Sequence, residues 1–91
     1  MEIRWSARAS EDIERIYWRI WENNPSAARE VLKTLYDGCS ALAMFPDRGR
    51  IGRMKGRREL VFQSLPYIAV YQIKDQTVEI SRIFHTAQDW P

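Results

Sequence analysis

Apolar and polar positions alternate with two different periods along the chain, and each period predicts a different kind of element. After Ser6, a residue suited to cap a helix, apolar side chains recur at steps of three and four, the spacing of one helix face. This first stripe contains Ala9, Ile13, Ile16, Tyr17, Ile20 and Trp21. A second stripe with the same spacing contains Ala28, Val31, Leu32, Leu35, Cys39, Leu42 and Ala43. The pattern predicts two amphipathic helices.

Helix-breaking and helix-capping residues mark where these helices begin and end. Asn23-Asn24-Pro25 separates them, because proline disfavours helical geometry in the residue before it and suits the first turn of a new helix. Phe45-Pro46 ends the second helix. The short link predicts an antiparallel helical hairpin. Gly38 costs about 1 kcal/mol relative to alanine inside a helix, so we expect it to mark a close contact with the first helix.

The other segments have the composition of β-strands. Residues 2–5 alternate polar and apolar, and three runs rich in β-branched and aromatic residues follow at 56–62, 66–73 and 77–85. Gaps of hairpin length join the three runs, which predicts an antiparallel meander with the N-terminal strand as an edge. The helical hairpin would cover one face. We therefore predict one α+β domain over residues 1–91, two-layered and ordered β-α-α-β-β-β.

Length and composition narrow the class of protein. Ninety-one residues form one domain with a modest core, for which an obligate partner is no surprise. The charged N-terminus lacks the apolar run of a signal peptide, and no stretch is long enough to span a membrane. Cys39 is the only cysteine, which excludes an internal disulfide and fits the cytoplasm. Its apolar neighbours in the stripe favour a buried, inert thiol over a catalytic one.

Positive charge is concentrated in one segment. The chain has a net charge of +2, yet six of its fourteen basic residues lie between Arg48 and Arg58, a segment without acids. Such a cluster on an otherwise acidic chain indicates an anionic partner. The alternative is a solvated loop over residues 47–55, whose arginines only aid solubility. If these residues face such a partner, we expect replacement of Arg50, Arg53 and Lys55 to leave stability nearly unchanged, since exposed charges contribute little.

Few residues could support chemistry. The sequence has no metal-ligand cluster, no phosphate-binding glycine motif and no nucleophile elbow. Arginine forks suit phosphate, and His85 could move a proton beside them, unless it is a structural strand-end histidine. Arg82 is in step with core positions Val78 and Ile80. This predicts either a β-bulge or a side chain that reaches past the sheet edge.

Several motifs, in this order and spacing, resemble the RelE/ParE superfamily of bacterial type II toxins. They are Trp5-Ser6 with Ala9, Asp12-Ile13 and Ile16-Tyr17; then 42–50; then Arg58-Glu59-Leu60, 67–71 and 82–85. The resemblance spans nearly the whole chain. It implies a toxin, without cofactor or metal, that is neutralised by an antitoxin whose C-terminal segment wraps around it.

The superfamily contains two activities, and the resemblance implies different residues for each. A ribosome-dependent mRNA endoribonuclease would use Arg58 and Arg82 to stabilise phosphate charge and His85 as acid or base. Many such enzymes have a tyrosine where this chain has Trp90, and an indole cannot transfer a proton. A ParE-like chain would instead bind DNA gyrase without chemistry of its own.

The N-terminal half and the junction at 45–49 are more ParE-like, and we favour that class. Residues expected to contact the target or nucleic acid are Arg48, Arg50, Arg53, Lys55 and Trp90. A non-toxic nucleic-acid-binding fragment is a third hypothesis, supported only by the basic segment.

Overall fold

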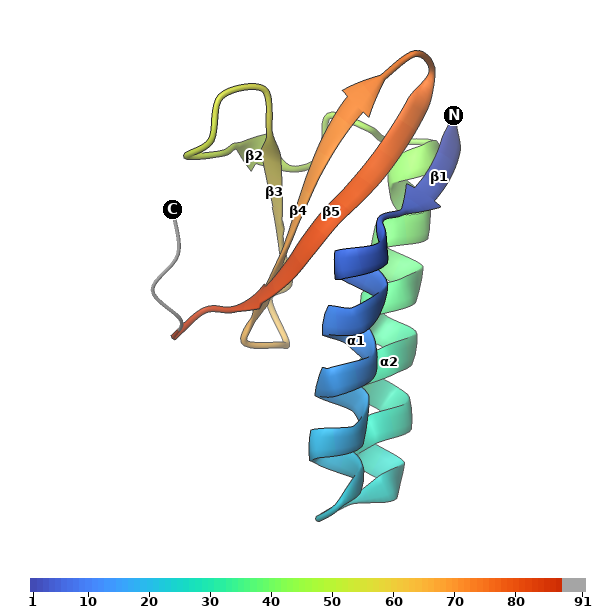
Figure 1. The fold of residues 1–91 in the computed structure, drawn as a ribbon, viewed down its shortest axis with the longest axis vertical. Coiled ribbons are helices and arrows are strands. Elements are labelled where there is room, and N and C mark those ends of the chain that lie inside the picture. The colour runs from blue at the N-terminus through green and yellow to red at the C-terminus, as the bar shows by residue number, and fades with distance from the viewer. Residues whose placement is uncertain (88–91) are drawn as a thin grey trace.

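Two antiparallel helices cover one face of a five-stranded sheet in the computed structural model, which describes residues 1–87 (Figure 1). The elements are β1 (Glu2–Trp5), α1 (Ala7–Trp21), α2 (Pro25–Ser40), the 3-10 helix η1 (Ala41–Ala43), β2 (Arg50–Ile51), β3 (Arg58–Val61), β4 (Tyr67–Lys74) and β5 (Thr77–His85). The strand order is β1-β5-β4-β3-β2; β1 runs parallel to β5 at one edge, and the other pairs are antiparallel. The predicted α+β fold is confirmed.

Both helices begin where the sequence indicates. The Ser6 hydroxyl oxygen accepts a hydrogen bond from the Ala9 amide at 3.0 Å, which caps α1. At α2, Asn24 accepts from the Ala27 amide at 3.1 Å, and Pro25 occupies the first turn. The break at 23–25 therefore ends one helix and starts the next.

The β4–β5 hairpin turns over two residues. Lys74 pairs with Thr77, and both Asp75 and Gln76 have positive φ, at 51° and 63°. Two consecutive positive φ values are those of a type I′ turn, whose twist matches that of the flanking strands. The short polar gap predicted between the last two strands is thus a tight turn.

Two expectations about local structure are wrong in detail. The loop expected over residues 47–55 contains β2, in which Arg50 and Ile51 pair with Glu59 and Arg58 and so occupy the free edge of β3. Gly38 does mark a close approach, but to the ring of Phe62, just after β3, and not to α1. A Cβ at Gly38 would lie 2.4 Å from Phe62 Cε1.

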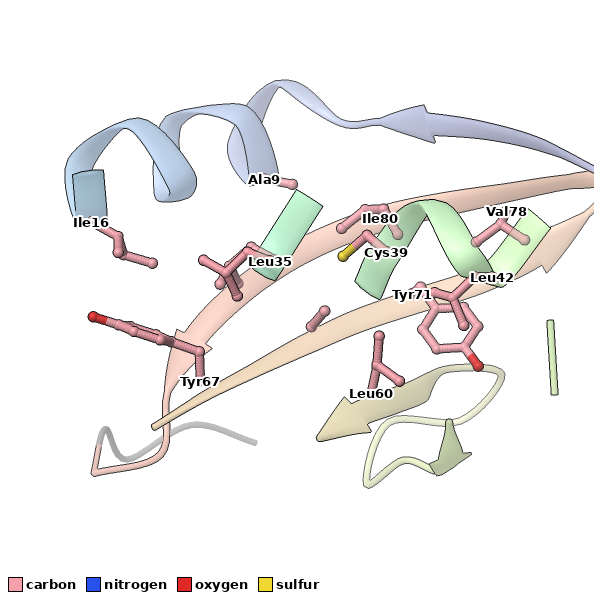
Figure 2. Packing of buried hydrophobic residues seen from close by; sticks show 12 residues of the cluster. Ala9, Ile16, Leu35, Cys39, Leu42, Leu60, Tyr67, Tyr71, Val78 and Ile80 are labelled. Carbon is pink, nitrogen blue, oxygen red and sulfur yellow. The ribbon is translucent and has the colours of Figure 1, made fainter. Parts of the chain in front are cut away.

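The core lies between the helical hairpin and the sheet (Figure 2). Leu35 and Cys39 of α2 lie over the middle of it, Leu42 of η1 lies beside Tyr71 toward one end, and Tyr67 lies with Ile16 at the other end (Figure 2). Cys39 is fully buried, and burial raises the pKa of its thiol to about 12, so it is the inert thiol expected. Within residues 1–87, no helix is long and apolar enough to cross a membrane.

Candidate functional site

A β-bulge at Ser81 redirects the side chains at the end of β5. Tyr71 of β4 pairs with Ile80, whereas Val70 pairs with Arg82, so Ser81 has no partner in the ladder. Residues before the bulge, such as Ile80, face the core, and after it Ile83 does. Phe84 packs instead with Val70 on the sheet face that the helices leave open. The bulge considered from the sequence is confirmed.

The guanidinium of Arg82 also reaches past the sheet edge, to Asp12 of α1. Its Nε and Nη2 donate to the two Asp12 carboxylate oxygens at 2.8 and 3.1 Å. Beyond Ile80, β1 no longer pairs with β5, so the backbone of β5 lies at the edge of the sheet. There the Asp12 carboxylate accepts a hydrogen bond from the Ile83 amide at 2.9 Å, in place of a carbonyl from a neighbouring strand. Arg15 adds a third donor at 3.0 Å.

These contacts fix the ionisation of Asp12. Burial raises the pKa of its carboxyl, but hydrogen bonds from Arg82, the Ile83 amide and Arg15 outweigh burial and hold the pKa below its usual range. The Asp12 hydrogen bond in turn raises the pKa of Arg82. Arg82 is therefore part of an ion pair that joins α1 to β5.

Three arginines of the basic segment, Arg50, Arg57 and Arg58, donate side-chain hydrogen bonds within the protein. Arg50 donates to the buried Glu59 carboxylate through Nε and Nη2 at 3.1 and 2.9 Å, and the Arg53 amide donates to the same group at 3.1 Å. Arg58 donates to the Gly49 carbonyl at 2.7 Å, and Arg57 donates to Gln72.

The other members of the segment face outward. Arg48 lies over the Phe45 ring at 5.0 Å, and the side chains of Arg53 and Lys55 are exposed. The segment is thus a folded loop built around Glu59, with Arg48, Arg53 and Lys55 on its surface.

His85 lies on the helix-covered side of the sheet. It packs edge-on against Tyr67, with ring centroids 5.3 Å apart, and lines a small pocket with Arg15 and Arg19 of α1. Its Nδ1 accepts a hydrogen bond from the Ala87 amide at 3.0 Å. The structural alternative considered for this residue, a strand-end histidine bonded to backbone, describes this geometry.

The structure does not bring the three nuclease candidates together. Arg58 pairs with Tyr71 and His85 with Tyr67, and four residues of extended strand separate these partners, about 13 Å. Arg82 turns to Asp12 at the β5 edge. The structure places Arg48, Arg50, Arg53 and Lys55 around β2, at the far side of the sheet. Trp90, the remaining candidate contact residue, lies outside the described residues.

A groove of about 370 Å³ crosses the open face of the sheet beside the bulge. Three arginines line it, Arg8, Arg57 and Arg82, around an apolar floor that includes Phe84. The Arg82 guanidinium lies over the Phe84 ring at 4.6 Å. Guanidinium groups beside an aromatic ring can hold an anionic, planar ligand. The sequence patterns did not select Arg8 or Phe84, because Phe84 faces the open side of the sheet only after the register shift at the bulge.

The groove's one carboxylate is Glu79, which is already bonded. Hydrogen bonds from Gln72 at 2.9 Å and from Arg4 at 3.1 Å lower the pKa of Glu79, so it is ionised at neutral pH and unsuited to general acid catalysis. Among residues 1–87, no three His, Cys, Asp or Glu side chains gather at metal-binding distance.

Comparison with known proteins identifies the family. The model of the ParE toxin of the parDE type II toxin–antitoxin system matches residues 3–90. The chain belongs to the ParE toxin family. Toxin RelE2 of Caulobacter vibrioides is 34% identical to this ParE-family chain over 96% of the chain and 97% of the relative. Protein Y4kP of Sinorhizobium fredii is 40% identical to this chain, over 98% of the chain and 92% of the relative.

Solved structures give the same fold. A chain of the chromosomal ParDE system from P. aeruginosa superposes with a TM-score of 0.87 at 23% identity, covering 93% of this chain and 95% of that one. A chain of the RelBE2 toxin–antitoxin complex from Mycobacterium tuberculosis superposes with a TM-score of 0.63 at 22% identity, covering 92% of this chain and 95% of that one. The superfamily resemblance inferred from the sequence is confirmed.

Proposed function

We propose that this ParE-family toxin arrests bacterial growth in the cytoplasm by binding DNA gyrase, without catalysing a reaction itself. The separation of Arg58, Arg82 and His85 is the observation that supports this function. A nuclease needs its proton-transfer group and its charge-stabilising groups around one phosphate, about 3 Å from the reacting atoms. Here His85 lies beside Tyr67 at the start of β4, Arg58 lies beside Tyr71 four residues further along it, and Arg82 forms an ion pair with Asp12.

A cognate antitoxin completes the proposal. Structures similar to this one come from toxin–antitoxin complexes, in P. aeruginosa and M. tuberculosis. Large apolar side chains also lie exposed around the end of α2 and η1, a composition typical of a surface that a protein partner covers. They are Met1, Tyr36, Met44 and Phe45. We expect the C-terminal segment of the antitoxin to wrap around the toxin and to cover this surface.

The alternative function is ribosome-dependent mRNA cleavage, and the open-face groove is the observation that favours it. Arg8, Arg57 and Arg82 could hold an RNA phosphate there. Cleavage would proceed by attack of the 2′-hydroxyl on the adjacent phosphate, with the arginines stabilising the developing charge. The groove lining contains no histidine among the described residues, so His85 would have to act from elsewhere.

Parallel assays with purified toxin separate the two functions. We expect inhibited supercoiling by gyrase and intact mRNA on translating ribosomes; cut mRNA with unaffected gyrase would contradict the proposal. His85→Ala sharpens the test, since general acid–base catalysis contributes about 10²–10⁴-fold to a nuclease and nothing to a gyrase inhibitor. In cells, expression of the toxin alone should stop growth, and co-expression of the antitoxin should restore it.

A further inference from the structure

The distal end of the helical hairpin has an aromatic surface that the fold does not need. The last turns of α1 and the first turns of α2 extend beyond the end of the sheet (Figure 1). Tyr17, Trp18 and Trp21 pack on one another there, with ring centroids 5.0 to 5.9 Å apart. Arg29 of α2 lies over the Trp21 ring at 5.6 Å. We refer to these three aromatic residues as the aromatic tip.

Trp18 is the outermost member of the tip. Trp18 is two residues after the buried Ile16, and at 100° per residue this places Trp18 on the opposite side of α1. Its exposed fraction is 53%, so half of a large indole meets solvent. Tyr17 and Trp21 are partly buried and hold it from the side. Tryptophan in such a position is the residue most enriched among the anchors of protein interfaces.

Three glutamates share the outward face of α1 with Trp18, together with Arg15, which is already bonded to Asp12. Glu14 and Glu22 stand one turn before and one turn after it, and Glu11 lies two turns before it. All three are exposed, and no ion pair within residues 1–87 includes any of them. Carboxylates repel nucleic acid phosphates and anionic lipid, and they attract lysine and arginine. The charge therefore suits a cationic protein surface.

We infer that the aromatic tip, with Glu11, Glu14 and Glu22, is the surface through which the toxin binds its protein target. This rests on the proposed function: gyrase must expose lysines and arginines wherever it holds DNA. Trp18 stacks on an arginine or lysine of that surface, and the glutamates pair with its neighbours. The exposed apolar residues proposed for the antitoxin lie at the other end of α2, so the two partners use different surfaces.

The test compares surface variants of the full chain, purified from its antitoxin complex. Trp18→Ala and the double variant Glu14→Lys/Glu22→Lys are expected to weaken gyrase inhibition and growth arrest at least about tenfold. Both leave the buried face of α1 intact, so antitoxin affinity and the circular dichroism spectrum should not change. Glu30→Lys reverses an exposed glutamate of α2, outside the surface, and should act like the wild type.

Each outcome decides the inference. Full toxicity of both variants would overturn it, and so would a parallel loss of antitoxin binding, since the surface would then belong to the antitoxin. If wild-type toxin arrests growth but leaves gyrase active, the gyrase proposal fails while the growth-arrest comparison still tests the surface. Cleaved mRNA with unchanged Trp18→Ala toxicity would overturn both. A wild type that does not arrest growth would also overturn both.

Discussion

Asp12 and Glu59 are buried to the same degree, with 2% of each residue exposed, yet they connect different parts of the molecule. Each accepts hydrogen bonds from an arginine side chain and from a backbone amide. The amide bound by Asp12 belongs to Ile83, 71 residues away, so Asp12 joins the helical layer to the sheet. Glu59 binds the amide of Arg53, six residues away, and only folds a loop back onto its own strand.

The two buried carboxylates are bonded in the same way, yet they should contribute differently to the stability of the fold. Loss of Asp12 would leave the Arg82 guanidinium, a quarter exposed, without its carboxylate partner at the interface between layers. Arg50, the partner of Glu59, is 57% exposed and can return to water. We therefore expect the two anchors to differ in their contribution to the free energy of unfolding.

The largest effect should follow Asp12→Ala. Removing one member of a buried ion pair typically destabilises a protein by about 3–5 kcal/mol, and here the Ile83 amide loses its acceptor as well. Urea denaturation of the purified variant measures the change. Glu11→Ala, at the exposed neighbouring position, is the control and should stay within about 0.5 kcal/mol of the wild type. Equal midpoints for the two variants would show that Asp12 does not hold the layers together.

Arg50→Ala should have an intermediate effect, about 1–3 kcal/mol, because the buried Glu59 carboxylate keeps only the Arg53 amide as a donor. This corrects the expectation from sequence that Arg50 can be replaced without loss. Lys55→Ala is the matched control, since Lys55 is exposed. If Arg50→Ala denatures at the same urea concentration as Lys55→Ala, the amide alone satisfies Glu59.

Most of the fold was predictable because local patterns determine it. Ser6, Pro25 and the 74–76 gap act through their own backbone geometry, and the sequence contains that information. The strand β2 was missed because two residues give no periodic signal. Gly38 was assigned the wrong neighbour because its contact with Phe62 depends on how α2 lies over the sheet.

The candidate site was less predictable, because the position of an arginine in the sequence does not indicate which carboxylate it will pair with in the fold. Arg50 was predicted to contact the target or nucleic acid and Arg82 to stabilise phosphate charge, yet each is bonded to a buried carboxylate, Glu59 on the neighbouring strand and Asp12 on α1. The motif that includes Asp12 was noted only as part of a family pattern. The bulge at Ser81 was one of two alternatives predicted from the position of Arg82 in step with Val78 and Ile80. It could be anticipated because this alternation of residues is visible within the strand's own sequence.

Acid should weaken the Asp12 anchor in a defined direction. The pKa of Asp12 is lower in the folded protein than in the unfolded chain, so its ionisation stabilises the fold above the usual aspartate pKa of about 3.9. This contribution is lost as the pH falls through the folded pKa. The stability difference between wild type and Asp12→Asn should therefore be constant near neutral pH and shrink below about pH 4. A difference that does not change down to pH 2 would contradict the assigned shift.

The smallest effect should follow Arg15→Ala, which removes the third donor to Asp12 and so tests where the strength of the anchor lies. Arg15 is half exposed and is three residues from Asp12 on the same helix, and such pairs contribute about 0.3–0.5 kcal/mol. Asp12 would still bind Arg82 and the Ile83 amide. We expect Arg15→Ala to match Arg19→Ala, an exposed arginine one turn later, within that margin. A loss above about 2 kcal/mol would mean that Asp12 stabilises α1 itself more than the junction between α1 and β5.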